Sequence, residues 1–149
     1  MRCRNTMMRS GLTALITLVC LVTSGVGSAD TVKDWLSSHH EGVFHTADLD
    51  VCYLENGGII HDCQLTFRTY GRLANDLSNI VLMPTWLNGN AEGLASSNYL
   101  GSTGIVDTDH YFVIAVNALG NGVSSSPSNS TQAPFPHFTI RDQVSLQYR

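Results

Sequence analysis

The chain has 149 residues, the length of one ordinary domain, and its hydrophobic and charged shares are 43% and 13%. These values are typical of a globular protein with a single core. The formal charge is −4 and no basic cluster occurs, which excludes nucleic acid and anionic membranes as expected partners. No heptads or internal repeats are visible, so coiled coils and repeat arrays are excluded as well.

The first 29 residues have the layout of a secretory signal peptide. Three arginines precede the largely apolar run Leu12–Val22, and small residues follow it up to Ala29. A membrane anchor is the alternative, but the run is well short of the roughly 20 residues that span a bilayer. A lipoprotein signal at Cys20 lacks the small residue that should precede that cysteine. We expect cleavage near Ala29 and a secreted or periplasmic product, residues 30–149, with no membrane contact after cleavage.

Cys52 and Cys63 flank a predicted β-hairpin. From Cys63 to Tyr70 apolar and polar side chains alternate, which is typical of an antiparallel strand with one buried face. Gly57 and Gly58 favour a two-residue turn, and this turn sets Cys52 directly opposite Cys63 at a separation that suits a disulfide. A bond is the ordinary state of such a pair in an exported protein, and two buried free thiols are the alternative. A turn one residue earlier would break the match.

Two short apolar runs, Ile80–Met83 and Tyr111–Val116, predict strands that are covered on both faces, as in a parallel sheet. The residues between them suffice for a right-handed crossover, with apolar residues at roughly helical spacing over 91–99. A hairpin that leads into a mostly parallel sheet is α/β architecture. The loops that leave these strands, 84–93 and 117–130, should lie side by side where such sheets bind ligands.

The last residues predict a helix. Thr139 and Asp142 form the pattern of a capping box, and Ile140, Val144 and Tyr148 share one face of the helix that follows. No Gly or Asn is in place to end this helix before the last residue. We therefore expect residues 30–149 to be the N-terminal portion of a longer domain.

Four blocks of the sequence, in this order, resemble the N-terminal half of the homoserine O-acetyltransferase family of α/β-hydrolase-fold proteins. They read LTFRTYGRL, NIVLMPTWLNGNAEG, GIVDTDHYFVIAVNALGNGVSSSPSNS and FPHFTIRDQV. The likeness runs from about Leu65 to the end. The methionine-pathway enzymes usually carry a histidine where this chain has Thr85, so the chain is more similar to a divergent branch of the family.

The resemblance implies a nucleophilic serine on a strand-to-helix elbow, followed by an aspartate and a histidine. Such a serine is acylated and passes the acyl group to an alcohol or to water. No Gly-x-Ser-x-Gly occurs here, and the family's elbow follows the helix that begins at Thr139. We therefore expect the triad beyond residue 149 and no catalytic side chain in this chain. The expected partner is a small acyl ester, or an acyl donor and acceptor, without a cofactor; the oligomeric state is left open.

The resemblance also places one oxyanion-hole donor in the loop after the first buried strand. By alignment of VLMPTWLNG it is the backbone N–H of Leu87, with Trp86 as the second candidate. Without the resemblance, Trp86 and Leu87 are interpreted as core residues at the end of a strand. The loop residues expected to line the pocket are Thr85, Asn88, Gly89, Gly120, Asn121 and Gly122.

Several other hydroxyl and imidazole groups invite a catalytic interpretation. They are Ser124, Ser125, Ser126, His39, His40, His45, His110 and His137. The three serines have no neighbouring base and are expected to be loop residues. The first three histidines lack a Cys, Asp or Glu that completes a metal spacing, so no metal is expected, and the last two suit surface or capping roles. Residues 129–131 form a glycosylation sequon, which matters only in a source that glycosylates.

A second hypothesis is a secreted, non-catalytic binding module, or an inactive remnant of the family, stapled by the cysteine pair. It would leave Tyr111–Val116 as an exposed apolar edge, because the strand expected beside it would carry the elbow, and such edges promote aggregation. The reading frame past the codon for Arg149 discriminates between the two hypotheses.

Overall fold

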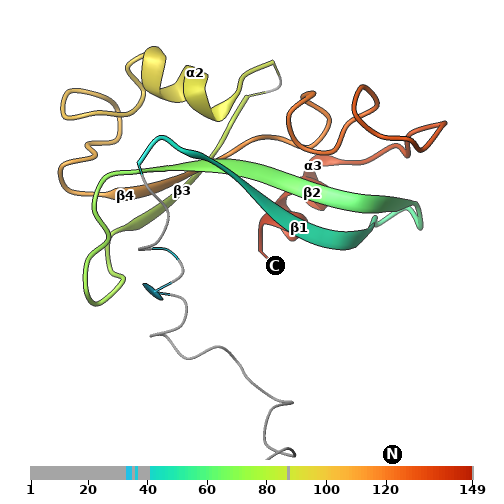
Figure 1. Cartoon of the computed structure of the whole chain (residues 1–149), viewed down its shortest axis with the longest axis horizontal. Coiled ribbons are helices and arrows are strands. Elements are labelled where there is room, and N and C mark those ends of the chain that lie inside the picture. The colour runs from blue at the N-terminus through green and yellow to red at the C-terminus, as the bar shows by residue number, and fades with distance from the viewer. Residues whose placement is uncertain (1–32, 35, 37–40, 87, 149) are drawn as a thin grey trace, which may run out of the picture.

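The computed structural model in Figure 1 describes residues 33, 34, 36, 41–86 and 88–148. The predicted signal peptide, His39, His40 and Leu87 lie outside the described residues. The named elements are β1 (Phe44–Tyr53), β2 (Ile59–Tyr70), β3 (Ile80–Pro84), α2 (Ala91–Ser96), β4 (Phe112–Val116) and α3 (Ile140–Gln147). In the described part of the chain, no helix is long and apolar enough to cross a membrane.

The four strands form one sheet in the order β1-β2-β4-β3. The pairs β1/β2 and β2/β4 are antiparallel, and β3/β4 is parallel. In Figure 1 the hairpin β1/β2 forms one half of the sheet and the parallel pair the other, with α2 above them. The predicted order of hairpin, strand, crossover and parallel strand is therefore confirmed, and the fold is part of an α/β architecture.

The core has two parts, because successive side chains of a strand point to opposite faces of the sheet. Val113 and Ala115 of β4 pack with Leu94 of α2 on one face. Val116 packs with Leu146 of α3 on the other. The apolar run of β4 thus serves both faces, as the absence of alternation predicts.

The edge strand of the parallel half of the sheet is β3 and not β4. The expectation that Tyr111–Val116 would be an exposed edge is wrong, because the strand order places β4 between β2 and β3. Of the two faces of β3 that the sequence predicts to be covered, one is covered, because Val81 and Met83 pack against the cluster that contains Leu94. On the other face Ile80 and Leu82 remain 37% and 47% exposed among the described residues. In the described part of the chain β3 pairs with β4 on one side and has no strand partner on the other.

Cys52 and Cys63 form a disulfide, with their Cα atoms 5.7 Å apart, but the predicted register of the hairpin is wrong. Cys52 pairs with Ile60, and Cys63 pairs with Asp50. Both cysteines are fully buried in the same cluster. The bond therefore joins diagonal neighbours on one face of the hairpin, which lie within reach of each other as directly opposite residues do.

The register differs because the hairpin closes through a longer loop, residues 54–58. In the loop the N–H of Leu54 donates to the carbonyl of Gly58 at 2.9 Å, and the side chain of Asn56 accepts from the N–H of Gly58 at 2.9 Å. Each strand also carries an extra residue at the same level of the hairpin, near Asp50 in β1 and Asp62 in β2, whose φ values are 59° and 51°. An extra residue in one strand shifts the pairing, but these two shifts are opposite, so the register is the same on either side of them.

The helix α3 begins at the predicted capping box. The side chain of Thr139 accepts from the N–H of Asp142, whose carboxylate accepts from the N–H of Thr139. The buried residues of α3 are Asp142 and Leu146, whereas Ile140 and Val144 are 80% and 61% exposed. The apolar face predicted from the sequence thus points away from the described core.

Candidate active-site loops

The loop after β3 and the loop after β4 contact each other at the carboxyl ends of the two parallel strands. The N–H of Thr85 donates to the carbonyl of Val116 at 2.9 Å. The hydroxyl of Thr85 accepts from the N–H of Ala118 at 3.0 Å. Further along, Nδ2 of Asn121 donates to the carbonyl of Gly89 at 3.0 Å. The two loops lie side by side, as the parallel arrangement of their strands predicts.

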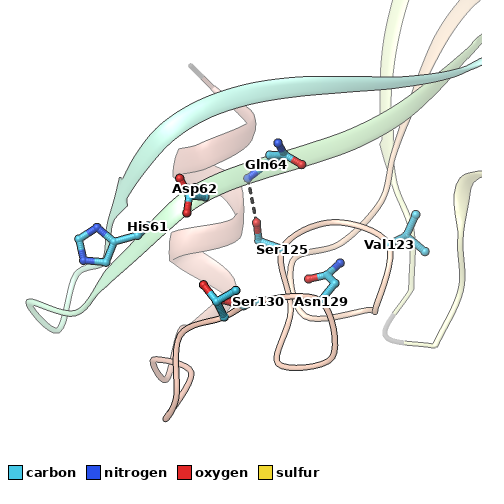
Figure 2. A pocket seen from close by; sticks show the side chains of 8 residues that line it. His61, Asp62, Gln64, Val123, Ser125, Asn129 and Ser130 are labelled. Carbon is cyan, nitrogen blue, oxygen red and sulfur yellow. Dashed lines mark hydrogen bonds between the residues drawn. The ribbon is translucent and has the colours of Figure 1, made fainter.

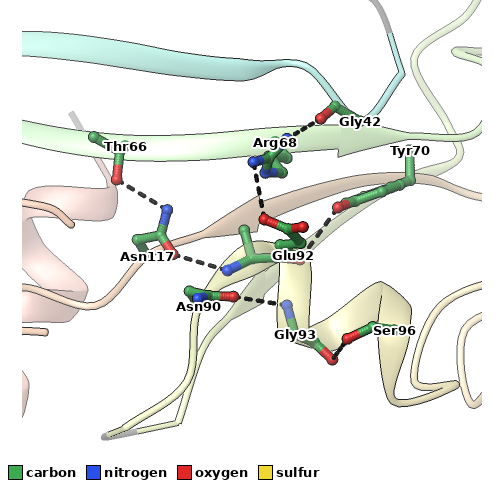
Figure 3. A network of polar contacts seen from close by, with 10 residues as sticks. Gly42, Thr66, Arg68, Tyr70, Asn90, Glu92, Gly93, Ser96 and Asn117 are labelled. Carbon is green, nitrogen blue, oxygen red and sulfur yellow. Dashed lines mark hydrogen bonds and ion pairs between the residues drawn. The ribbon is translucent and has the colours of Figure 1, made fainter.

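Asn117, the first residue after β4, joins three elements (Figure 3). Its Oδ1 accepts from the N–H of Ala91 at 2.8 Å, and its Nδ2 donates to Oγ1 of Thr66 at 2.9 Å. The side chain is 1% exposed, and a buried carboxamide without partners would be costly. We did not single out Asn117 from the sequence; a polar residue directly after an apolar strand is the signal that would have found it.

Two of the three consecutive serines take the place of a strand beside β2. β4 ends at Val116, opposite Phe67, so the part of β2 that precedes Phe67 has no partner in β4. There Oγ of Ser124 accepts from the N–H of Thr66 at 3.0 Å, and Oγ of Ser125 accepts from the N–H of Gln64 at 2.8 Å. The serine-rich loop is therefore an ordered part of the sheet edge and not a flexible linker.

The same contacts leave the serines without the surroundings of a nucleophile. Ser124 is 0% exposed, and its hydroxyl donates to the carbonyl of Asn117 at 2.8 Å. Oγ of Ser126 lies 3.0 Å from Oδ1 of Asn129, to which it donates. A nucleophilic serine needs an accessible oxygen and a base in hydrogen-bond reach. These serines instead hold the loop.

Gly120 and Gly122 allow the backbone path that brings Asn121 toward Gly89. Their φ values are 82° and 88°, in the left-handed region that favours glycine. Between them, Oδ1 of Asn121 accepts from the N–H groups of Val123 and Ser124 at 3.0 and 3.2 Å. Oδ1 of Asn121 thus stabilises the loop to which Asn121 belongs, and Nδ2 binds the loop after β3.

Comparison with known proteins gives close relatives, although no model of a known protein family matches the chain. A probable esterase from Corynebacterium glutamicum is 38% identical, and the match covers 73% of this chain and 32% of the relative. An ethyl acetate hydrolase from Pseudomonas veronii is 33% identical, over 78% of this chain and 34% of the relative. A homoserine O-acetyltransferase from Sulfurimonas autotrophica is 34% identical, over 64% of this chain and 31% of the relative.

The chain belongs to the homoserine O-acetyltransferase-like family of the α/β-hydrolase superfamily. Solved structures agree with this assignment. An acetylester hydrolase from Corynebacterium glutamicum matches with a TM-score of 0.64 and 38% identity, covering 71% of this chain and 32% of that chain. The acetyl esterase MekB matches with a TM-score of 0.65 and 34% identity, and the match covers 72% of this chain and 32% of MekB. The expected family and fold class are confirmed, and the chain spans about a third of the length of the relatives it matches.

In this α/β-hydrolase chain, the predicted oxyanion donor, Leu87, and the second candidate, Trp86, come shortly after the end of β3 at Pro84. Leu87 lies outside the described residues. Trp86 is 45% exposed, so it is not a core residue. Its ring lies 5.6 Å from that of Tyr99 and covers Gly89, where a side chain would collide with the indole. Trp86 thus packs against the loop that leads into α2.

The residues expected to line a pocket differ in exposure. Those that are buried or half-buried are Thr85, Gly89 and Asn121, and those that are exposed are Asn88, Gly120 and Gly122. Thr85 borders a hollow of about 280 Å³ together with Ala118 and Val144 on the outer side of α3. The structure therefore brings Thr85, Gly89 and Asn121 to the contact between the two loops.

A polar hollow of about 210 Å³ lies between β2 and the serine-rich loop. Figure 2 shows His61 at the hairpin end of this hollow, away from Ser125, whose Oγ is bonded to the N–H of Gln64. Asp62 and Asn129 also line it. The arrangement contains no pairing of serine with histidine and does not form a nucleophilic site.

A charged contact ties β2 to α2 (Figure 3). The guanidinium of Arg68 donates to the carbonyl of Gly42 and lies 3.3 Å from Oε2 of Glu92. The hydroxyl of Tyr70 donates to the carbonyl of Ala91 at 3.2 Å. Burial raises the pKa of Tyr70 above its usual value, so the phenol stays protonated and serves as a donor to the start of α2.

Two of the described histidines, His45 and His110, contact neighbouring side chains. His45 stacks on Phe67 with ring centroids 5.4 Å apart. His110 lies 2.8 Å from the carboxylate of Asp107, whose pKa is lowered by the N–H of Asp109 and by His110. Within the described part of the chain, no group of three or more His, Cys, Asp or Glu side chains could hold a metal ion.

Proposed function

We propose that this chain is the N-terminal portion of an exported α/β-hydrolase-fold enzyme that hydrolyses a small acyl ester. The product begins near residue 30, after removal of the signal peptide, and is secreted or periplasmic. The observation that carries the proposal is the match to a probable esterase, which covers 73% of this chain but 32% of the relative. The nucleophilic serine, the aspartate and the histidine then belong to the part of the enzyme beyond residue 149.

The open side of β3 supports a place for the missing nucleophile. β3 pairs with β4 on one side and has no strand on its other side among the described residues, which leaves backbone N–H and C=O groups at that edge without strand partners. A further parallel strand beside β3 would pair with them. Its carboxyl end would lie next to Thr85 and Trp86, because parallel strands end at the same edge of a sheet. A serine on the elbow after that strand would then face the loop after β3.

The proposed reaction passes through an acyl-enzyme. The serine oxygen attacks the ester carbonyl while the histidine takes the proton of the hydroxyl. The oxyanion that forms accepts hydrogen bonds from the N–H of the residue after the serine and from the N–H of Leu87, with Trp86 as the second candidate. The alcohol leaves with the proton from the histidine, and water then releases the acid by the reverse sequence. No cofactor is needed.

Hydrolysis is favoured over transfer to homoserine. The probable esterase is 38% identical to this chain, and the homoserine O-acetyltransferase named above is 34% identical. An exported enzyme also meets water and dissolved esters, whereas acetyl-CoA, the donor that the resemblance implies for acetylation, is cytosolic. The proposed partner is therefore a small acyl ester, with water as the acceptor.

The full product of the gene tests the proposal through labelling by a serine-reactive fluorophosphonate and hydrolysis of p-nitrophenyl acetate. We expect one label per molecule of the full product, and none on residues 30–149 alone. Leu87→Pro, which removes one N–H, should lower kcat by about 100- to 1000-fold, while Leu87→Ala should not. A full product that is folded but neither labelled nor active would contradict the proposal and favour a non-catalytic binding module.

A further inference from the structure

The loop between β3 and α2 is fixed at both of its ends by the segment that follows β4. At the β3 end, the N–H of Thr85 donates to the carbonyl of Val116, and the hydroxyl of Thr85 accepts from the N–H of Ala118, at 2.9 and 3.0 Å. Thr85 is 9% exposed. The first bond continues the parallel ladder by one residue beyond β3, and the second adds a side-chain contact, so together they set the direction in which the loop leaves the sheet.

At the α2 end, two asparagine side chains hold the loop. Nδ2 of Asn121 donates to the carbonyl of Gly89 at 3.0 Å. Oδ1 of Asn117 accepts from the N–H of Ala91 at 2.8 Å (Figure 3). One bond holds a backbone carbonyl, at Gly89, and the other holds a backbone N–H two residues later, at Ala91. Together they restrain the backbone at the start of α2.

Each asparagine is itself fixed on its far side. Asn117 is anchored to β2 through Oγ1 of Thr66 at 2.9 Å. Asn121 is anchored by the N–H groups of Val123 and Ser124. A side chain whose other polar atoms are bonded in this way loses little further freedom when it holds a neighbour. The restraint on the loop after β3 therefore passes into the central strands of the sheet.

We propose that Asn117 and Asn121 are positioning residues for the loop after β3 and keep its backbone N–H donors aligned for the oxyanion. The inference rests on the proposed ester hydrolysis. Oxyanion donors are effective only when they are held in place before charge develops, and a displacement of about 1 Å can cost about 100-fold in rate. The donors are backbone groups, so only contacts with the backbone on either side of them can fix their position.

The substitution Asn121→Asp isolates the contact between the loops. The carboxylate keeps both acceptor bonds to Val123 and Ser124, but it has no donor for the carbonyl of Gly89 and repels it. A matched control is Asn75→Asp, because Asn75 is exposed and accepts only from Nζ of Lys33, at 2.8 Å, among the described residues. Both variants add the same charge.

Hydrogen exchange measured by mass spectrometry on the full chain tests the restraint. In Asn121→Asp, the peptide over residues 88–96 should exchange about five- to tenfold faster, the factor expected for one lost hydrogen bond, while the peptide over 122–126 keeps its protection. Asn75→Asp should change neither peptide. Unchanged exchange over 88–96 in Asn121→Asp would overturn the inference.

The catalytic part is measured on the full product of the gene. Asn121→Asp should lower kcat for p-nitrophenyl acetate about 10- to 100-fold with less than a threefold change in KM, and Asn75→Asp should change neither constant. Faster exchange with unchanged kcat would show that the restraint does not serve the reaction, and would overturn the inference. A wild-type product that is neither active nor labelled contradicts the proposed hydrolysis instead, and the exchange result still decides whether Asn121 holds the loop.

Discussion

Replacement of Asn117 by alanine removes the side chain that joins β2, β4 and α2. The N–H of Ala91 would lose its acceptor in the interior, at a cost of about 1–3 kcal/mol for an unsatisfied buried donor. The bond to Thr66 would be lost as well, at about 1 kcal/mol, although the hydroxyl of Thr66 still lies 3.2 Å from that of Ser124. We therefore expect Asn117→Ala to lower the free energy of unfolding by about 2–4 kcal/mol, which is large beside a typical total of about 5–15 kcal/mol.

Urea unfolding followed by tryptophan fluorescence measures this loss, with Asn75→Ala as the control. Asn75 is exposed, and surface substitutions of this kind change stability by about 0.5 kcal/mol or less. If Asn117→Ala destabilised the chain no more than the control does, the network drawn in Figure 3 would not stabilise the fold and the reasoning would be refuted.

Two further predictions concern the hairpin and its contact with α3. Reduction of Cys52–Cys63, which closes a loop of sequence separation 11, should lower stability by about 2–3 kcal/mol; an unchanged urea midpoint with a reductant present would contradict this. Burial opposes ionisation of Asp142, but the N–H groups of Glu55 and Thr139 outweigh it and hold the pKa of Asp142 below 3.8. This stabilisation is therefore present above the unfolded value and is lost as pH falls through the folded pKa. The stability difference between wild type and Asp142→Asn should thus shrink from pH 7 to pH 3, and a constant difference would refute the assignment.

Local patterns predicted the elements that depend on nearby residues. Alternation identified β2, apolar runs identified β3 and β4, and the pair Thr139 and Asp142 identified the start of α3. These signals survive because period and capping are properties of a few consecutive residues. The side-by-side position of the two loops also followed, since it requires only that β3 and β4 be parallel.

The wrong predictions concern features that depend on contacts between residues far apart in the sequence or on the exact length of a loop. The hairpin register depends on the length of the loop 54–58, which the pair Gly57 and Gly58 does not fix by itself. The edge position of β3 depends on strand order, and order is a property of the whole sheet. The contacts of Asn117 and Ser124 reach β2 across 51 and 58 residues, so a serine-rich stretch resembles a linker in sequence although it is ordered in the fold.

The central claim is that this chain supplies the oxyanion loop of an esterase whose nucleophile lies beyond residue 149. The most direct measurement is to sequence the genomic DNA or the transcript past the codon for Arg149. We predict that the frame continues into an apolar strand with a Gly-x-Ser-x-Gly elbow, followed by the aspartate and the histidine of a triad. A stop codon directly after Arg149 would contradict the claim, and the family relationship would then describe ancestry without catalysis.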